Sequence, residues 1–183
     1  KTIDLTTFTL RYHELAWLSI EGLEKHWDES IVHAELGNQK LQVQSKNITR
    51  IKLQFENQDY PFASDKPVSL EVDAQPLVAQ FQSVDQAKVL WLTKNSIGMW
   101  ETNTHSGVPE KGLAKRPGLS GPIDDAFMDA FVWVAPTNTD ASKPTWYDRE
   151  FLHATQEWRR HFRGDIVTKS ELTEADIADN NLI

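Results

Sequence analysis

The stretch GLSGP at 118–122 contains the serine of this chain that most resembles a catalytic nucleophile. A nucleophile elbow requires glycine two residues after the serine, with a strand before it and a helix after it. This chain has Pro122 at that place, and the clear apolar strand pattern follows Ser120 instead of preceding it. We therefore expect no catalysis by Ser120. The side chains that could complete a Ser-Asp-His order are Asp124, Asp148, His153 and His161.

Two other groups of side chains carry acids or histidines at suggestive spacing. His153, Glu157 and His161 follow one another at intervals of four, so one helix could present all three to a metal ion. Three ligands on one helix rarely complete a site, and we interpret them as a flank of the solvated face. Asp124 and Asp125 are adjacent, and in an extended segment they would point to opposite sides. We expect them to bond to loop amides rather than to act as an acid and base pair.

Tryptophan is frequent, and tryptophan rings on the surface could bind sugars. A sugar-binding platform would form if Trp17, Trp27, Trp91 and Trp100 shared one exposed sheet face. Trp17 and Trp91 stand between apolar neighbours, which favours the core for both.

The triplet N-I-T at 47–49 matches the pattern for N-glycosylation, but it falls in a region of strand pattern, and short matches are common by chance.

The composition excludes several classes of function. The 183 residues carry a formal net charge of −8, which disfavours nucleic acids and anionic membrane surfaces as partners. Cysteine is absent, which excludes disulfides, thiol catalysis and thiolate metal sites. No apolar run approaches the ~20 residues of a membrane span. The first residues have no apolar core after a basic start, as a signal peptide would, and they indicate a strand already in progress.

Residues 1–105 have the pattern of an antiparallel β-sandwich. Short stretches of alternating apolar and polar residues recur at close spacing, as in ITRIKLQFE at 48–56, where Ile51, Leu53 and Phe55 share one face. Gly37–Asn38 suits a tight hairpin turn. Seven or eight such strands predict a sandwich.

The pattern changes in residues 126–183. AFVWVAP at 130–136 is apolar throughout, as in a strand buried on both faces. A helix is predicted after it, with Thr145 as N-cap and Gly164 as C-cap, then a strand in DIVTKS, a short helix opened by Thr173 and a last strand in NLI. This order predicts a small, partial flavodoxin-like βαβαβ unit, truncated at its C-terminus, within an α+β chain. The apolar stripe of the long helix consists of Tyr147, Phe151, Ala154, Trp158 and Phe162.

Residues 106–125 are predicted to join the two parts. Glycines there allow backbone angles that other residues resist, and prolines stiffen the crossing. The charged side chains could satisfy loop backbone groups or hold a neighbouring domain. The residues assigned to this structural and interface motif are Lys115, Arg116, Gly118, Gly121, Asp124 and Asp125.

The segments KRPGLSGPIDDAFMDAFVWVAPT and EWRRHFRGDIVTKSELTEADIADNNLI carry a resemblance. They resemble the C-terminal region of bacterial prolyl-oligopeptidase-like proteins, which are peptidases and esterases of the α/β-hydrolase fold. The resemblance covers nearly the whole chain, and it implies that a hydrolase domain with the serine elbow precedes residue 1. It also implies a secreted or periplasmic location and no catalytic residue in this chain.

The function expected is therefore that of a non-catalytic accessory region that packs on or orients the hydrolase domain of the same parent protein. A carbohydrate-binding β-sandwich is the alternative, and hydrolysis by Ser120 is a third. The expected partners are that hydrolase domain and, in a homo-oligomer, another copy of the chain. We expect no metal and no cofactor. Flavin is not expected because no phosphate-binding glycine loop follows FVWVAP.

Overall fold

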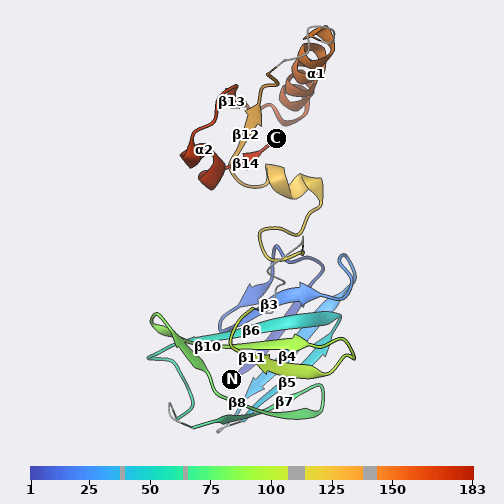
Figure 1. Cartoon of the computed structure of the whole chain (residues 1–183). Helices are drawn as coiled ribbons and strands as arrows, with labels where there is room; N and C mark the ends of the chain where they lie inside the picture. The colour runs from blue at the N-terminus through green and yellow to red at the C-terminus, as the bar shows by residue number, and fades with distance from the viewer. Residues whose placement is uncertain (38–39, 64–65, 107–113, 138–143) are drawn as a thin grey trace. The chain divides into compact units, whose positions relative to one another are not determined.

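The computed structural model describes residues 1–37, 40–63, 66–106, 114–137 and 144–183 (Figure 1). The chain forms two compact units, Lys1–Ser120 and Gly121–Ile183, which we call the β unit and the α/β unit. The division falls inside the stretch 106–125. Asn38 of the predicted hairpin turn and much of that stretch lie outside the described residues.

The β unit contains two sheets built from short strands. The first has the order β1-β4-β5-β7-β8, with β1 Thr2–Thr7, β4 Ser30–Leu36, β5 Lys40–Lys46, β7 Val68–Val72 and β8 Gln75–Ala79. The second has the order β11-β10-β6-β3-β2, with β11 Trp100–Asn103, β10 Ala87–Lys94, β6 Ile48–Glu56, β3 Leu18–Leu23 and β2 Glu14–Leu15. The short strand β9, Gln82–Val84, pairs with β10.

The core of the β unit lies between these two sheets. In β6 the side chains of Ile51, Leu53 and Phe55 are buried, as the alternation predicts, while Lys52 and Gln54 face outward. Apolar side chains of both sheets form one continuous cluster, so the chain is a sandwich here.

One strand pair departs from the predicted antiparallel arrangement. β5 and β7 run parallel, with Leu41 opposite Leu70 and Val43 opposite Val72. Between them the chain crosses to the other sheet to form β6, and it then returns in the original direction. Such a crossover is what a parallel pair requires, and the local alternation in each strand carries no information about it.

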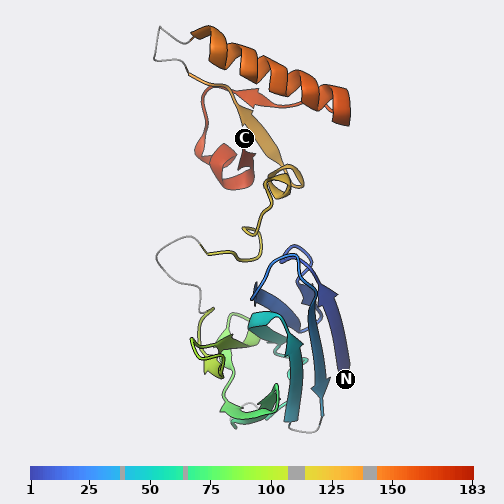
Figure 2. The ribbon, with the colours of Figure 1, turned by 90° about the vertical axis from the view of Figure 1, so that its right-hand side faces the viewer.

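The α/β unit has a three-stranded sheet in which all pairs are parallel. β12, Phe131–Val134, lies in the centre, between β13, Thr168–Lys169, and β14, Asn181–Leu182. Helices α1, Pro144–Phe162, and α2, Glu174–Asp179, lie on opposite sides of β12 (Figures 1 and 2). The predicted order of strands and helices is therefore present, although β13 is shorter than the DIVTKS segment.

Both ends of α1 differ from the prediction. The helix includes Pro144, so Thr145 lies within it and is not the N-cap; proline is well tolerated in a first turn because it needs no intrahelical N–H bond. At the other end, Arg163 rather than Gly164 has the left-handed conformation, with φ of 56°. The Arg163 N–H donates to the carbonyl of Arg159 at 2.9 Å, which closes the last turn.

Aromatic rings hold α1 to the sheet. Trp158 stacks on Phe127 with ring centroids 5.1 Å apart, and it meets Phe131 and Trp133 edge-on at 5.0 and 6.5 Å. Phe162 stacks on the other side of Trp158 at 4.3 Å, although it remains largely exposed. Trp158 thus links the helix to β12 and to the segment before it, and Phe151 adds an edge-on contact with Trp133 at 6.2 Å.

Helix α2 begins with the predicted cap. The Thr173 hydroxyl accepts the Asp176 N–H at 3.2 Å, and the Asp176 carboxylate accepts the Thr173 N–H at 3.0 Å, which completes a capping box. Lys169 of β13 donates to the same carboxylate at 2.5 Å. The hydrogen bond from Lys169, and then those from Thr173, lower the pKa of Asp176 from 3.8 to about 2.

We expect this carboxylate to make the α/β unit sensitive to acid. Because the pKa of Asp176 is lower in the folded state than in the unfolded chain, its stabilising contribution is complete above about pH 4. It is lost as the pH falls through 2. Urea unfolding followed by tryptophan fluorescence between pH 5 and 2 should show this decline in the native chain and a weaker one in Asp176→Asn. Asp179→Asn, an exposed change on the same helix, is the control, and an equal decline in all three would contradict the assignment.

Candidate functional site

The segment KRPG begins with a tight turn. Arg116 and Leu119 exchange two backbone hydrogen bonds, of 3.1 and 2.9 Å, across Pro117 and Gly118. Gly118 has a φ of 75°, and proline followed by a left-handed glycine is the sequence that a type II turn favours. The glycine of the motif is therefore used for backbone geometry.

The segment GPIDDAF forms a helical turn rather than an extended strand. Gly121 has a φ of 68°, and Ile123–Phe127 is a 3-10 helix that lacks a side-chain cap. The expectation that Asp124 and Asp125 point to opposite sides of an extended segment is wrong, because the segment is not extended. Neighbours on a 3-10 helix lie about a third of a turn apart. Asp124 is exposed, while Asp125 is half-buried and its N–H donates to the Pro122 carbonyl at 3.0 Å.

The charged residues of the motif are divided between the two units. Lys115 and Arg116 belong to the β unit, and both side chains are exposed. Nη2 of Arg50 in β6 donates to the Lys115 carbonyl at 3.0 Å and to the Glu21 carbonyl at 2.8 Å. This arginine anchors the segment to the sandwich. This role could not be predicted, since Arg50 occurs in an ordinary alternating strand.

The candidate serine triad is not assembled within either unit. Ser120 belongs to the β unit and is 4% exposed, so its hydroxyl is closed to a substrate in this conformation. The acids and histidines that could complete the triad, which are Asp124, Asp148, His153 and His161, all belong to the α/β unit.

The three candidate metal ligands lie on α1 as predicted, but they do not converge. His161 Nε2 lies 3.1 Å from the Glu157 carboxylate, which also accepts a bond from Arg160 at 3.4 Å. His153 is exposed one turn away. In the described ranges, no three histidine or acidic side chains gather in a way that could hold a metal ion.

Asn47, the candidate glycosylation site, holds a turn together. It lies between β5 and β6 with a φ of 61°, not within a strand. Its Oδ1 accepts the Lys25 N–H at 2.8 Å, and its Nδ2 donates to the Lys25 carbonyl at 2.7 Å and to the Ser30 hydroxyl at 2.8 Å. A glycan would be attached to this same nitrogen, which here donates hydrogen bonds that hold the turn.

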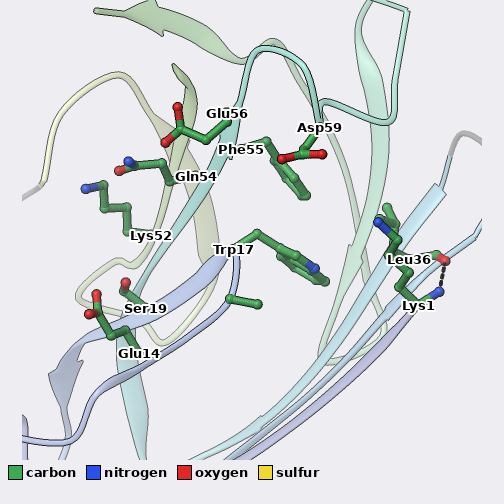
Figure 3. Close-up of a pocket in the computed structure, with 11 residues that line it drawn as sticks. Lys1, Glu14, Trp17, Ser19, Leu36, Lys52, Gln54, Phe55, Glu56 and Asp59 are labelled. Atoms are coloured by element: carbon green, nitrogen blue, oxygen red, sulfur yellow. Dashed lines mark hydrogen bonds between the residues drawn. The ribbon is translucent and has the colours of Figure 1, made fainter. Parts of the chain in front are cut away.

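The four tryptophans do not form one platform. The Trp17 ring stacks on the buried Phe55 at 5.1 Å, and Figure 3 shows it pointing away from the outer face of β6. Trp100 is buried, and its Nε1 donates to Asp73 of the opposite sheet at 2.8 Å. Trp27 is exposed in the turn after β3, and Trp91 lies alone among them on the outer face of the second sheet.

Exposed aromatic side chains stand on two loops of the β unit that a backbone hydrogen bond joins, and we call this surface the aromatic end: Phe8, Tyr12 and Trp27. The Trp27 N–H donates to the Phe8 carbonyl at 2.9 Å, which holds these two loops together. Phe8 and Trp27 are each 51% exposed, and Tyr12 of the same loop is 70% exposed. Burial and then the charge of Lys115 lower the pKa of His26, the residue before Trp27.

An open groove crosses the outer face of the second sheet, and we call it the outer-face groove. It has a volume of about 560 Å³. Three side chains of β6 face three of β10 across it, and the turn at 84–86 closes one end. The facing pairs are Lys52 with Trp91, Gln54 with Val89, and Glu56 with Ala87.

The same β6 side chains also border a second hollow. Lys52, Gln54 and Glu56 line a cavity of about 450 Å³ that extends toward Glu14 and Ser19 (Figure 3). Sequence reasoning missed both hollows. The only signal was the small size of Ala87 and Val89 at outward positions of a strand otherwise rich in large residues.

No family model matches the chain, and neither a curated protein nor a solved structure resembles it significantly. In the part of the chain that the structure describes, no helix has both the length and the apolar character to cross a membrane.

Proposed function

We propose that the chain is a non-catalytic accessory region of a secreted or periplasmic serine-hydrolase-type protein, where it packs on the hydrolase domain. The family resemblance rests on the residues around 115–127. In the structure these residues serve backbone geometry, as Gly118 and Gly121 do, or pack in the α/β unit, as Phe127 does. A motif used in this way supports a scaffold role rather than a reaction centre.

The aromatic end is the surface that we assign to the hydrolase domain. Exposed aromatic side chains on joined loops suit the centre of an interface, because they bury a large area at little cost in conformational entropy. The charge of Lys115, which acts on His26 next to Trp27 in the sequence, favours a partner with acidic groups near its own apolar patch. The exposure of Phe8 and Trp27 on loops that a backbone hydrogen bond joins is the observation that carries the proposal.

The test is a binding titration between this chain and the segment encoded directly before it in the parent reading frame. The double variant Phe8→Ser, Trp27→Ser should weaken the association by roughly 100-fold, since two interface rings contribute about 3 kcal/mol together. Val78→Ser on β8 removes an apolar side chain elsewhere that is 69% exposed, and it serves as the control. Unchanged affinity in the double variant would reject this surface, and no association at all would reject the accessory role.

We also propose that the α/β unit has a flavodoxin-like topology. Its first strand is central, its second and third lie on either side, and all are parallel, which is the order 2-1-3 of that fold. The arrangement of α1 and α2 on opposite sides of β12 supports the same assignment.

A further inference from the structure

The outer-face groove has an apolar floor that the sandwich core does not require. Val89 and Ala87 point outward from β10, yet they are only 5% and 7% exposed. Neither belongs to the apolar cluster between the sheets. Their neighbours across the ladder, Gln54 and Glu56, are longer, so the two rows of side chains leave a trough between them.

An aromatic ring lies at one end of the trough, and the walls of the trough carry polar side chains without a hydrogen-bond partner among the described residues. Trp91 is half-buried, and the Lys52 ammonium lies 5.5 Å from its ring centroid. In the described part of the chain, the side chains of Gln54, Glu56 and Asp85 form no hydrogen bond or ion pair with the protein. These amide and carboxylate groups are available to a ligand.

We propose that the outer-face groove binds a neutral oligosaccharide, with a sugar ring against Trp91 and its hydroxyls on Gln54 and Glu56. A sugar ring has an apolar C–H face, which packs on an indole, and a rim of hydroxyls, which pair with amides and carboxylates. The groove offers a partner for each: the Trp91 ring for the C–H face, and the Gln54 and Glu56 side chains for the hydroxyls. The second hollow beyond β6 gives room for further sugar units toward Ser19.

Other occupants fit the groove less well. A peptide strand would need a free sheet edge, but β6 and β10 are paired with each other along the groove. A polyanion would meet Glu56 and Asp85 with only Lys52 to oppose them, so like charges disfavour nucleic acids and acidic polysaccharides. The inference rests on this geometry and not on the accessory role proposed above.

The test is calorimetric titration of the full chain with hexasaccharides of glucose, xylose, mannose and N-acetylglucosamine, with polygalacturonate and denatured casein as comparisons. At least one neutral hexasaccharide should bind. Trp91→Ala should weaken that binding by about 10-fold or more, which corresponds to the loss of one stacking contact of about 1.4 kcal/mol.

Two further variants separate a binding role from a folding role. Gln54→Ala leaves the ring in place and should still weaken binding several-fold, with an unchanged melting temperature. Trp146→Ala removes an exposed tryptophan that does not line the groove and should leave binding unchanged. The proposal is overturned if no neutral hexasaccharide binds, if only polygalacturonate or casein binds, or if Trp91→Ala and Gln54→Ala bind like the native chain.

Discussion

Asn47→Ala should lower the free energy of unfolding of the β unit by about 3 kcal/mol, because it removes hydrogen bonds to Lys25 and Ser30 that alanine cannot replace. Alanine must also adopt the left-handed φ of 61° without the local bonds that make it acceptable for asparagine. Urea unfolding of the native and variant chains, followed by tryptophan fluorescence, measures the difference.

Two variants at the same position separate these causes. Asn47→Gly tolerates the left-handed backbone but loses the side-chain bonds, so it should destabilise less than alanine does. Asn47→Asp keeps an acceptor for the Lys25 N–H but sets a carboxylate oxygen against the Lys25 carbonyl, so it should also destabilise the turn. Equal stability of native chain and alanine variant would show that the turn at 24–30 does not depend on this amide.

Trp158→Ala should destabilise the α/β unit by about 3 kcal/mol or more, since a large ring is removed from the centre of an aromatic cluster. A small unit has little stability to lose, because a small domain buries a modest share of its surface. We expect the variant to lose the near-UV circular dichroism of this cluster while the strands of the β unit persist.

Leu152→Ala is the matched control for that experiment. It lies on the same helix but is 55% exposed, so its truncation should change stability by well under about 1 kcal/mol. A native near-UV spectrum in Trp158→Ala, or an equal loss in Leu152→Ala, would show that the ring cluster does not hold α1 in place.

Much of the fold could be predicted because its signals are local. Alternation in β6 identifies which side chains are buried, and the unbroken apolar run of β12 indicates a strand with neighbours on both sides. The cap at Thr173 also follows from its own neighbours. The parallel pairing of β5 with β7 could not be predicted, because it depends on where the chain goes between them.

The candidate sites depended on contacts between distant residues and were predicted less well. Asn47 matched a modification pattern, but its four-bond role requires the turn at 24–30 to lie beside it. Trp17 and Trp91 have similar neighbours in sequence, yet the Trp17 ring packs against the core and lines the hollow beyond β6, whereas Trp91 lines the outer-face groove. Register across β6 and β10 creates that groove, and register is not visible within one strand.

We propose that the reaction centre of the parent protein lies outside these 183 residues. Labelling the full-length parent protein with a serine-directed fluorophosphonate and mapping the labelled peptide tests it most directly. We predict that the label falls on a serine encoded before Lys1, and that Ser120→Ala leaves the labelling unchanged. A label on Ser120, or on any other serine of this chain, would contradict the account.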